Sequence, residues 1–422
     1  MNLIQKDKQY VWHPFTQAKT ANDPLVIVKG KDAWVYDENG KKYLDANSSW
    51  WTIIHGHGNT YIADKINQQF LTLDHSVFAG VTHPKAIESA QKIVNILPDN
   101  FSKVFFSDNG STAVEVALKM VFQYWYNKGV HKKKIIAIEG SYHGDTFGSM
   151  SVSQRGYFNQ PFEHLFFEVD FIPFPTSDNI DNVLKKMKTL VNSEQVAGFI
   201  FEPLVQGASG MRMYAPKILD QLLQIAKSKN VLCIADEVMT GFYRTGTMFA
   251  INQIQEKPDI ICLSKGITGG VLPIGFTIAT QTIFDAFLSD DTTKALLHGH
   301  SFTANPISCS AVCANIELLQ QKKIQQQISN IVKQHQLFAL EIKQHPMVAE
   351  VRQTGTILAI ELHNQAGTTY FSNLKDKAYQ YFIQRGLLLR PLGNVIFINP
   401  PYCISKNELE FAYQIITDFL NN

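Results

Sequence analysis

One carboxylate and one lysine near the middle of the chain each follow an apolar run that is typical of a buried strand. Asp236 follows the run at residues 231–235, and Lys265 follows the run at residues 260–263 after a single serine. In open α/β sheets, ligands bind just beyond the carboxyl ends of the strands. A lysine there can condense with an aldehyde, and a carboxylate can keep a heterocyclic nitrogen protonated. Pyridoxal phosphate chemistry needs this pair.

Each of these motifs has a plainer interpretation when it is taken alone. A carboxylate after a strand is often a helix cap or a partner in a surface salt bridge. A lysine followed by glycine after a strand is usually part of a solvated loop. The catalytic interpretation therefore depends on further motifs elsewhere in the chain.

A phosphate site is predicted at residues 107–112 (Ser-Asp-Asn-Gly-Ser-Thr), which join a strand to a helix. Gly110 permits close backbone approach, and Ser111 offers a hydroxyl and a first-turn N–H where a helix N-terminus favours an anion. An ordinary helix cap leading to Glu115 gives the same pattern and is the commoner explanation from the residues alone. The segment is not a Walker loop, because no Gly-Lys-Ser/Thr follows the glycine.

Residues 139–144 (Glu-Gly-Ser-Tyr-His-Gly) also follow a strand. Tyr142 can lay its ring on a flat heterocycle, or it can be a packed tyrosine in a glycine-rich turn. His143 has no neighbours at metal-ligand spacing, so a structural or stacking role is expected for it.

These motifs resemble, in type and in order, those of the class III pyridoxal-phosphate aminotransferases of fold type I. The resemblance also includes Glu-Pro-Leu-Val-Gln-Gly from residue 202, Ala-Asp-Glu-Val from residue 235 and Leu-Ser-Lys-Gly-Ile from residue 263, and it runs from about residue 12 to residue 402. Within the class, residues 12–16, 48–51 and 390–393 are most similar to members that aminate 8-amino-7-oxononanoate in biotin biosynthesis.

The resemblance implies a role for individual residues in binding pyridoxal 5'-phosphate. Lys265 would hold the cofactor through its ε-amine and later carry a proton, and Asp236 would pair with the ring nitrogen. The other implied cofactor contacts are Gly110 and Ser111 for the phosphate, Tyr142 for the ring face, Glu202 for the pocket floor beside Asp236, and Ser301 for the phosphate of a second subunit.

The resemblance also implies how the substrates are bound. Phe15 and Trp50 would line the channel beside Tyr142 and Lys265, and Arg390 would take the carboxylate of the oxo acid. Phe15 departs from the tyrosine that family members often carry, so a hydroxyl contact to substrate would be missing. Gly299 would belong, with Ser301, to a loop that crosses between subunits of a homodimer with shared active sites. Arg244 is expected near the site.

The implied activity is a ping-pong amino transfer from S-adenosylmethionine to 8-amino-7-oxononanoate. One rival is another class III aminotransferase that uses ornithine, 4-aminobutyrate or a diamine, and lysine is an alternative donor. A second rival is a catalytically silent relative that serves as a binding or regulatory module. The intact Lys265 and Asp236 argue against the silent relative.

The composition of the whole chain limits the fold classes, partners and locations that are possible. The 422 residues are 45% hydrophobic and 18% charged, which suits a globular protein with a large core. The net charge of +1 gives no electrostatic case for nucleic acid or for an anionic membrane. Five cysteines without a CxxC pair indicate core residues and no metal site. With no signal segment or membrane span in the sequence, we expect a soluble cytoplasmic protein.

The elements that must position these residues form a regular alternation. Strands near residues 103, 135, 196, 231, 260 and 274, with helices at 111–126 and 216–229, predict an α/β fold with a mostly parallel sheet covered on both faces. The fold-type-I resemblance implies a seven-stranded sheet. We divide the chain into residues 1–55, which contribute to a small domain, residues 56–324 as the large cofactor-binding domain, and residues 325–422 as the rest of the small α+β domain.

Other elements follow from local patterns. A hairpin turn at residues 37–40 predicts a small antiparallel sheet between residues 25 and 46, and residues 11–17 predict an irregular arm. Further helices are predicted near 60–73, 84–97, 305–321, 373–385 and 406–420, and further strands at 357–362 and 395–398.

Overall fold

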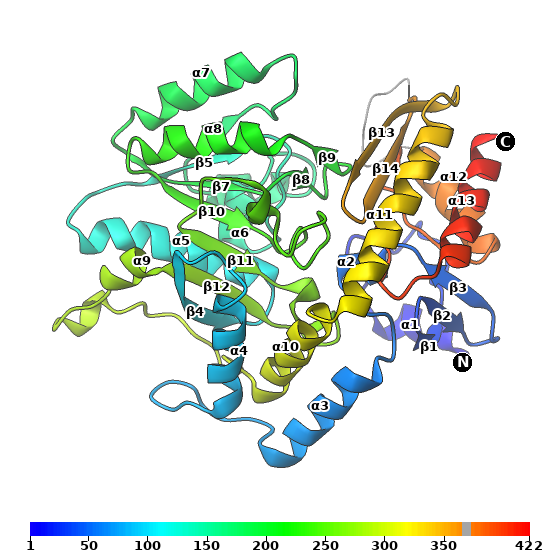
Figure 1. Ribbon diagram of the computed structural model, residues 1–422, viewed down its shortest axis with the longest axis horizontal. Coiled ribbons are helices and arrows are strands. Elements are labelled where there is room, and N and C mark those ends of the chain that lie inside the picture. The colour runs from blue at the N-terminus through cyan, green and yellow to red at the C-terminus, as the bar shows by residue number, and fades with distance from the viewer. Residues whose placement is uncertain (365–372) are drawn as a thin grey trace.

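The computed structural model describes residues 1–364 and 373–422, and its centre is a seven-stranded sheet (Figure 1). In spatial order the strands are β4 (Phe101–Ser107), β12 (Gly275–Thr280), β11 (Ile260–Leu263), β10 (Leu232–Asp236), β7 (Val196–Phe201), β5 (Lys134–Ile138) and β6 (Val169–Ile172). Only β12 runs antiparallel to its neighbours, β11 and β4. The predicted mostly parallel α/β sheet is therefore confirmed.

The central strands are apolar because helices cover them on both faces. Every residue of β7, β10 and β11 is buried, as is usual for parallel strands covered on both sides. Side chains alternate between the faces, so Ile234 packs in the cluster with α5 (Gly110–Asn127), whereas Cys233 and Ala235 pack in the cluster with α8 (Pro216–Lys227). The same face as α8 also takes α4 (Pro84–Val94) and α7 (Ile180–Val191).

The two ends of the chain meet in a second region, at the right of Figure 1. One sheet has the order β1 (Ile27–Lys31), β2 (Trp34–Asp37), β3 (Lys42–Asp45) and β15 (Leu387–Leu388), and a second has β13 (Val348–Thr354), β14 (Ile357–Leu362) and β16 (Val395–Ile398). The helices α12 (Asn373–Gln384) and α13 (Lys406–Leu420) accompany them. Strand β15, from the C-terminal part of the chain, pairs with β3, from the N-terminal part. This pairing joins the two parts of the chain in one sheet, as expected for a small domain that both parts build.

The predicted domain division is only partly reflected in the elements. The seven-stranded sheet lies wholly inside residues 56–324. The predicted boundary at 324/325, however, falls in the first turn of α11 (Lys322–Ile342), which follows α10 (Pro306–Leu319) and runs on toward β13. The boundaries themselves stay a prediction.

Most predicted elements are present, including α3 (Thr60–Thr72), but several elements had not been predicted. Those missed are α1 (Leu3–Tyr10), α2 (Ser48–Trp51), α6 (Phe147–Val152), β6, α7, β8 (Val205–Gln206), β9 (Arg212–Met213), α9 (Gln281–Asp285), α11, β13, β15 and the short 3₁₀ segments η1 (Gln160–Leu165), η2 (Ala250–Gln253), η3 (Lys265–Thr268) and η4 (Thr292–Lys294). Helix α11 did carry a signal, since Ile328, Ile331, His335, Phe338 and Ile342 are buried along it at helical spacing.

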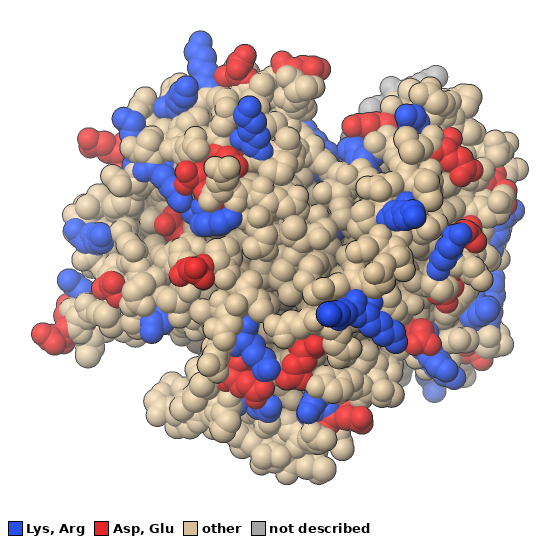
Figure 2. All heavy atoms as spheres, viewed as in Figure 1, with Lys and Arg blue, Asp and Glu red and all other residues tan. Residues whose placement is uncertain are grey.

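Two further properties concern the charges on the surface and the character of the helices. Basic and acidic side chains are interspersed over the face drawn in Figure 2. Among the described residues, no helix combines the length and the apolar character that crossing a membrane would need.

Candidate active site

Lys265 and Asp236 lie together at the carboxyl ends of two neighbouring parallel strands. Asp236 ends β10, which pairs with β11, and Lys265 begins η3 just after β11. Both side chains line an inner cavity of about 470 Å³. The structure thus brings together the pair that the sequence predicted, at the sheet edge where ligands bind.

The backbone and surroundings of Lys265 prepare its amine for reaction. Lys265 has a left-handed φ of +46°, and its turn is held by Asn315, whose amide donates to the carbonyls of Gly266 and Ile267 at 3.0 and 2.8 Å. Its Nζ lies 4.9 Å from the centre of the Trp51 ring. Burial lowers the pKa of Lys265, and the charge of Asp236 opposes that shift. A lowered pKa favours the neutral amine, which is the nucleophilic form.

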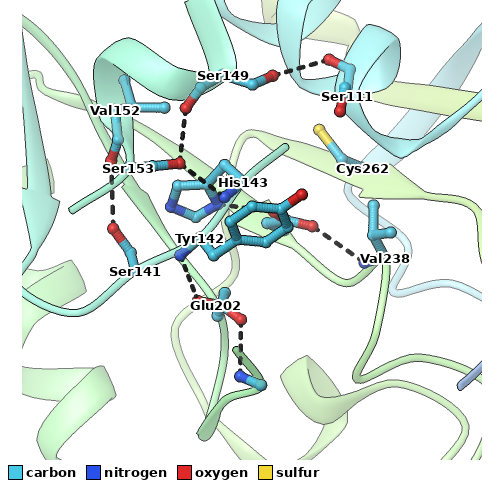
Figure 3. Close-up of polar contacts among 12 residues, drawn as sticks. Ser111, Ser141, Tyr142, His143, Ser149, Val152, Ser153, Glu202, Val238 and Cys262 are labelled. Carbon is cyan, nitrogen blue, oxygen red and sulfur yellow. Dashed lines mark hydrogen bonds and ion pairs between the residues drawn. The ribbon is translucent and has the colours of Figure 1, made fainter. Parts of the chain in front are cut away.

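Asp236 is held by His143, which is a correction to the sequence-based roles. His143 Nδ1–H donates to Asp236 Oδ2 at 2.7 Å, and the N–H of Val238 donates to Oδ1 at 3.1 Å (Figure 3). Glu202, which was expected to help fix Asp236, instead accepts from the N–H groups of Tyr142 and Gly207 at 3.0 and 2.9 Å. Glu202 therefore fixes the Tyr142 backbone, and His143 fixes the carboxylate.

The electrostatics of this buried group follow from the same contacts. Burial raises the pKa of Glu202 to about 7, Asp236 raises it further, and His143 and the two N–H groups lower it. His143 Nε2 is buried and has no hydrogen-bond partner among the described residues. The carboxylate of Asp236 consequently has one oxygen bonded to an imidazole and the other to a backbone N–H, which aims it in one direction.

The first turn of α5 lies where the sequence predicts a phosphate site. Asn109 caps the helix, accepting from the Thr112 N–H at 2.9 Å, so the cap does not use Ser111. Glu115 is not part of a capping box, because it accepts from the N–H groups of Gly148 and Ser149. Residues 108–111 line the inner cavity, leaving the positive end of an 18-residue helix facing it.

Gly144 lets a second loop close over this helix end. Its φ is +125°, and a Cβ there would lie 1.9 Å from Ser111 Oγ, so only glycine fits. The next residue, Asp145, donates its N–H to Ser111 Oγ at 3.1 Å and accepts from the Tyr142 hydroxyl at 2.8 Å. Burial raises the pKa of Tyr142, which keeps the phenol protonated. Asp145 was missed from the sequence, although it directly follows the Tyr-His-Gly motif.

The inner cavity fits pyridoxal 5'-phosphate on the chemistry of its lining. A helix N-terminus for the phosphate, an aromatic ring, a carboxylate and an amine of lowered pKa border one space. Of the residues predicted to bind the cofactor, Gly110, Ser111, Tyr142, Glu202, Asp236 and Lys265 all line it.

An outer cavity of about 1310 Å³ adjoins the inner one through Trp51, Tyr142, Gly144, Ala208 and Lys265, which line both. Phe15, Trp50 and Arg390 line it as predicted. The Trp50 ring stacks on Trp51 with centres 5.0 Å apart, and the Arg390 guanidinium lies 5.7 Å from the Trp50 ring centre. Phe15 meets the edge of Phe158 at 5.9 Å.

Trp50 and Trp51 form one wall of the outer cavity, the tryptophan wall, and they lie on a left-handed turn that contains no glycine. Ser48, Ser49, Trp50 and Trp51 have φ of 50°, 45°, 68° and 72°. Side-chain bonds hold the turn: Ser48 Oγ donates to the Asn399 carbonyl at 2.8 Å, and Asp45 accepts from the N–H and hydroxyl of Ser49 at 2.9 and 2.7 Å. Left-handed non-glycine residues cost roughly 1–2 kcal/mol each, and such strain concentrates at functional sites.

Three predicted residues lie away from both cavities. Gly299 and Ser301 line neither cavity and lie on a loop between η4 and α10. Arg244 is fully buried and donates to the carbonyls of Pro400 and Trp51 at 2.7 and 3.5 Å. Through these two bonds, Arg244 supports the turn that carries Trp50 and Trp51.

Known proteins resemble this chain along nearly its whole length. Residues 16–420 match the model of the aminotransferase class-III family. The adenosylmethionine-8-amino-7-oxononanoate aminotransferase of Synechococcus elongatus is 46% identical over 421 residues, covering 98% of each chain. That of Staphylococcus aureus is 37% identical, covering 100% of this chain and 97% of its own.

Solved structures agree with the sequence comparison. The adenosylmethionine-8-amino-7-oxononanoate aminotransferase of Methanocaldococcus jannaschii superposes with a TM-score of 0.93 at 34% identity, covering 99% of this chain and 98% of its own. An omega transaminase of Pseudomonas jessenii in complex with PMP superposes with a TM-score of 0.93 at 26% identity, covering 100% and 98%.

Proposed function

The chain belongs to the class III aminotransferase family, and on that premise we propose that it transfers an amino group from S-adenosylmethionine to 8-amino-7-oxononanoate. The product would be 7,8-diaminononanoate, an intermediate of biotin biosynthesis. The observation that carries the proposal is the meeting of Lys265, Asp236 and the first turn of α5 at one cavity. The substrates come from the names of relatives up to 46% identical.

The residues of the inner cavity would hold pyridoxal 5'-phosphate, on which the family depends. When bound, this group supplies an aldehyde and an electron-withdrawing ring that accepts and releases the amino group. Lys265 Nζ would bind the aldehyde carbon, Asp236 would contact the ring nitrogen, and the N–H groups of the α5 first turn would bind the phosphate. Tyr142 would lie against the ring.

The chain's own groups then perform the proton transfers. The negative charge of Asp236 favours the protonated ring nitrogen, and His143 keeps that carboxylate in place. With its amine free, Lys265 Nζ would take the proton from the substrate carbon that bears the amino group and would deliver it to the carbon on the other side of the transferred nitrogen. Its lowered pKa suits it to act as a base. Trp50 and Trp51 would form an apolar side of the channel next to Lys265.

Single half-reactions test the donor directly. We expect S-adenosylmethionine alone to convert the bound cofactor of the holoenzyme to its amino form, seen as a loss of its yellow absorbance. Lysine, ornithine, 4-aminobutyrate and a diamine are the comparison donors, with the amino cofactor measured by chromatography. Adding 8-amino-7-oxononanoate should restore the original spectrum. Conversion by one of the comparison donors and not by S-adenosylmethionine would refute the donor assignment.

Arg390→Ala should weaken the oxo acid and spare the donor. A charge-assisted hydrogen bond contributes about 1.5–3 kcal/mol, so the KM for the oxo acid is expected to rise about 10- to 100-fold. The donor has no carboxylate at that end of its chain, so its half-reaction should keep its concentration dependence. The check is the concentration dependence of both half-reactions. An equal loss in both would remove Arg390 from this role.

We further propose a homodimer in which the loop at residues 297–302 completes the site of the partner. Gly299 and Ser301 lie outside the cavities of their own chain, and the loop exposes Leu297 and Phe302 at 75% and 64%. Apolar side chains of this kind are commonly covered in an interface. Sedimentation equilibrium should give twice the chain mass of 47.6 kDa. A fully active protein of monomer mass would contradict the dimer.

A cytoplasmic location is also proposed. All five cysteines are free, and four of them are buried: Cys233, Cys262, Cys309 and Cys313. Thiols in this state are usual in a reducing compartment. Fractionation of the source cells should place the protein with cytoplasmic markers, and recovery from an exported fraction would contradict the proposal.

A further inference from the structure

The outer cavity contains a second arginine whose guanidinium is fixed in position. Arg212 lies on β9 and its guanidinium carbon is 3.7 Å from the centre of the Phe174 ring. Its Nη1 also lies close to Gly140, where an added Cβ would be 2.9 Å away. Arg212 lines the outer cavity, and the stacking on Phe174 holds the plane of its guanidinium there.

Arg212 differs from its neighbours in having no charge partner. Arg352 pairs with both Glu350 and Glu361, and Arg155 donates to the carbonyls of Met150 and Ser153. By contrast, no described carboxylate lies within ion-pair distance of Arg212, and its guanidinium makes no hydrogen bond to a described residue. Burial lowers the pKa of Arg212 and the like charge of Arg352 adds to the effect, while the more distant carboxylates of Glu361 and Glu139 oppose it.

The charges around the outer cavity do not balance. Its described lining residues include five positive side chains (Lys265, Arg155, Arg212, Arg352 and Arg390) and three negative ones (Asp145, Glu350 and Glu361). Lys265 would be used by the cofactor, and Arg155 and Arg352 have partners. Arg212 and Arg390 are left without an ion pair, and of these two only Arg212 is half-buried, where an unpaired charge is costly.

We propose that Arg212 is a second carboxylate-binding residue of the outer cavity, which grips a substrate carboxylate through the open edge of its guanidinium. The fork of N–H groups matches a carboxylate bidentately, and the stacking on Phe174 fixes its plane in advance. The inference rests on the proposed function, which supplies two sources of this group: the oxo acid and the amino donor. Arg212 does not touch the reacting atoms, so it sets affinity and not the limiting rate.

Half-reactions of the Arg212→Met holoenzyme distinguish the two sources. If the oxo acid is the source, its apparent dissociation constant rises about 10- to 100-fold while that of the donor stays unchanged, and the reverse holds for the donor. Limiting rates stay at the wild-type value in either case. Arg385→Met is the matched control, because Arg385 also stacks on an aromatic ring, that of Tyr381 at 3.5 Å, but is exposed and lines neither cavity.

Two non-reacting inhibitors that differ in charge test whether Arg212 recognises the charge of the carboxylate. Nonanoate and the uncharged nonanamide are compared as inhibitors, and the preference for nonanoate should fall in Arg212→Met if the oxo acid is the source. Arg212→Lys, which keeps the charge but loses the fork, should give a smaller rise and carries the test if the methionine variant does not fold. Unchanged constants for both substrates, or an equal rise in both with a lower limiting rate, would overturn the proposal. A wild-type enzyme without either half-reaction would instead refute the proposed function.

Discussion

Lys265→Ala is expected to abolish turnover and leave a folded protein. The variant loses both the attachment point for the cofactor and the base that moves the substrate proton. General base catalysis alone contributes about 10²- to 10⁴-fold, so steady-state transamination should fall at least that far. Small primary amines added to the solution should restore part of the rate, because they supply the missing base. The measurement is formation of 7,8-diaminononanoate over time, with and without added amine.

The fold of this variant should survive because the strand ends do not depend on the lysine side chain. The turn at Lys265 is held by Asn315, which bonds to the carbonyls of Gly266 and Ile267. Lys185→Ala on the exposed surface of α7 is the control for loss of a lysine and should keep full activity. Steady-state activity of Lys265→Ala near that of Lys185→Ala would refute the catalytic assignment.

Asp236→Asn should keep the cofactor and lose most of the rate. Asparagine has nearly the same shape, and its oxygen can still accept from His143, but the negative charge beside the ring nitrogen is gone. An opposite charge at this range shifts a pKa by about 1–3 units, so the protonated ring and the limiting rate should fall about 10- to 1000-fold. Single-turnover rates and the pH dependence of the cofactor spectrum check this.

Asp259→Asn is the control for Asp236→Asn. Asp259 is a carboxylate at the opposite end of the same two strands, where it accepts from the Cys233 N–H at 2.8 Å and lines neither cavity. Its substitution should affect stability and spare the limiting rate. If Asp236→Asn keeps the wild-type rate while its cofactor content is normal, the charge of Asp236 has no part in the reaction.

The sheet and the principal pair could be predicted because they depend on local pattern. Strands buried on both faces are continuous apolar runs, and β7 begins at Val196, where a strand was predicted. Since neighbouring parallel strands end at one edge, Asp236 and Lys265 had to lie near each other once β10 and β11 were paired.

The contacts around the pair could not be predicted, because they join residues far apart in sequence. The bond from His143 to Asp236 spans 93 positions, and nothing in a Tyr-His-Gly motif specifies it. The sequence offered Ser111 or Thr112 as an ordinary cap of α5, whereas the side chain of Asn109 takes that position in the structure. Arg212 has no local signal, because its lack of a partner is a property of the folded cavity.

The left-handed turn at residues 48–51 affects both the stability of the fold and the substrate selectivity of the channel. At roughly 1–2 kcal/mol for each residue, the turn holds several kcal/mol of strain, of which a single glycine at position 48 or 49 would release about 1–2 kcal/mol while losing the side-chain hydrogen bond of the serine it replaces. Such a glycine would also loosen the indole wall that shapes the channel. Substitutions at Ser48 or Ser49 that raise thermal stability are therefore expected to change the shape of the substrate channel as well. Substitutions there that let the channel accept bulkier amines should likewise change thermal stability.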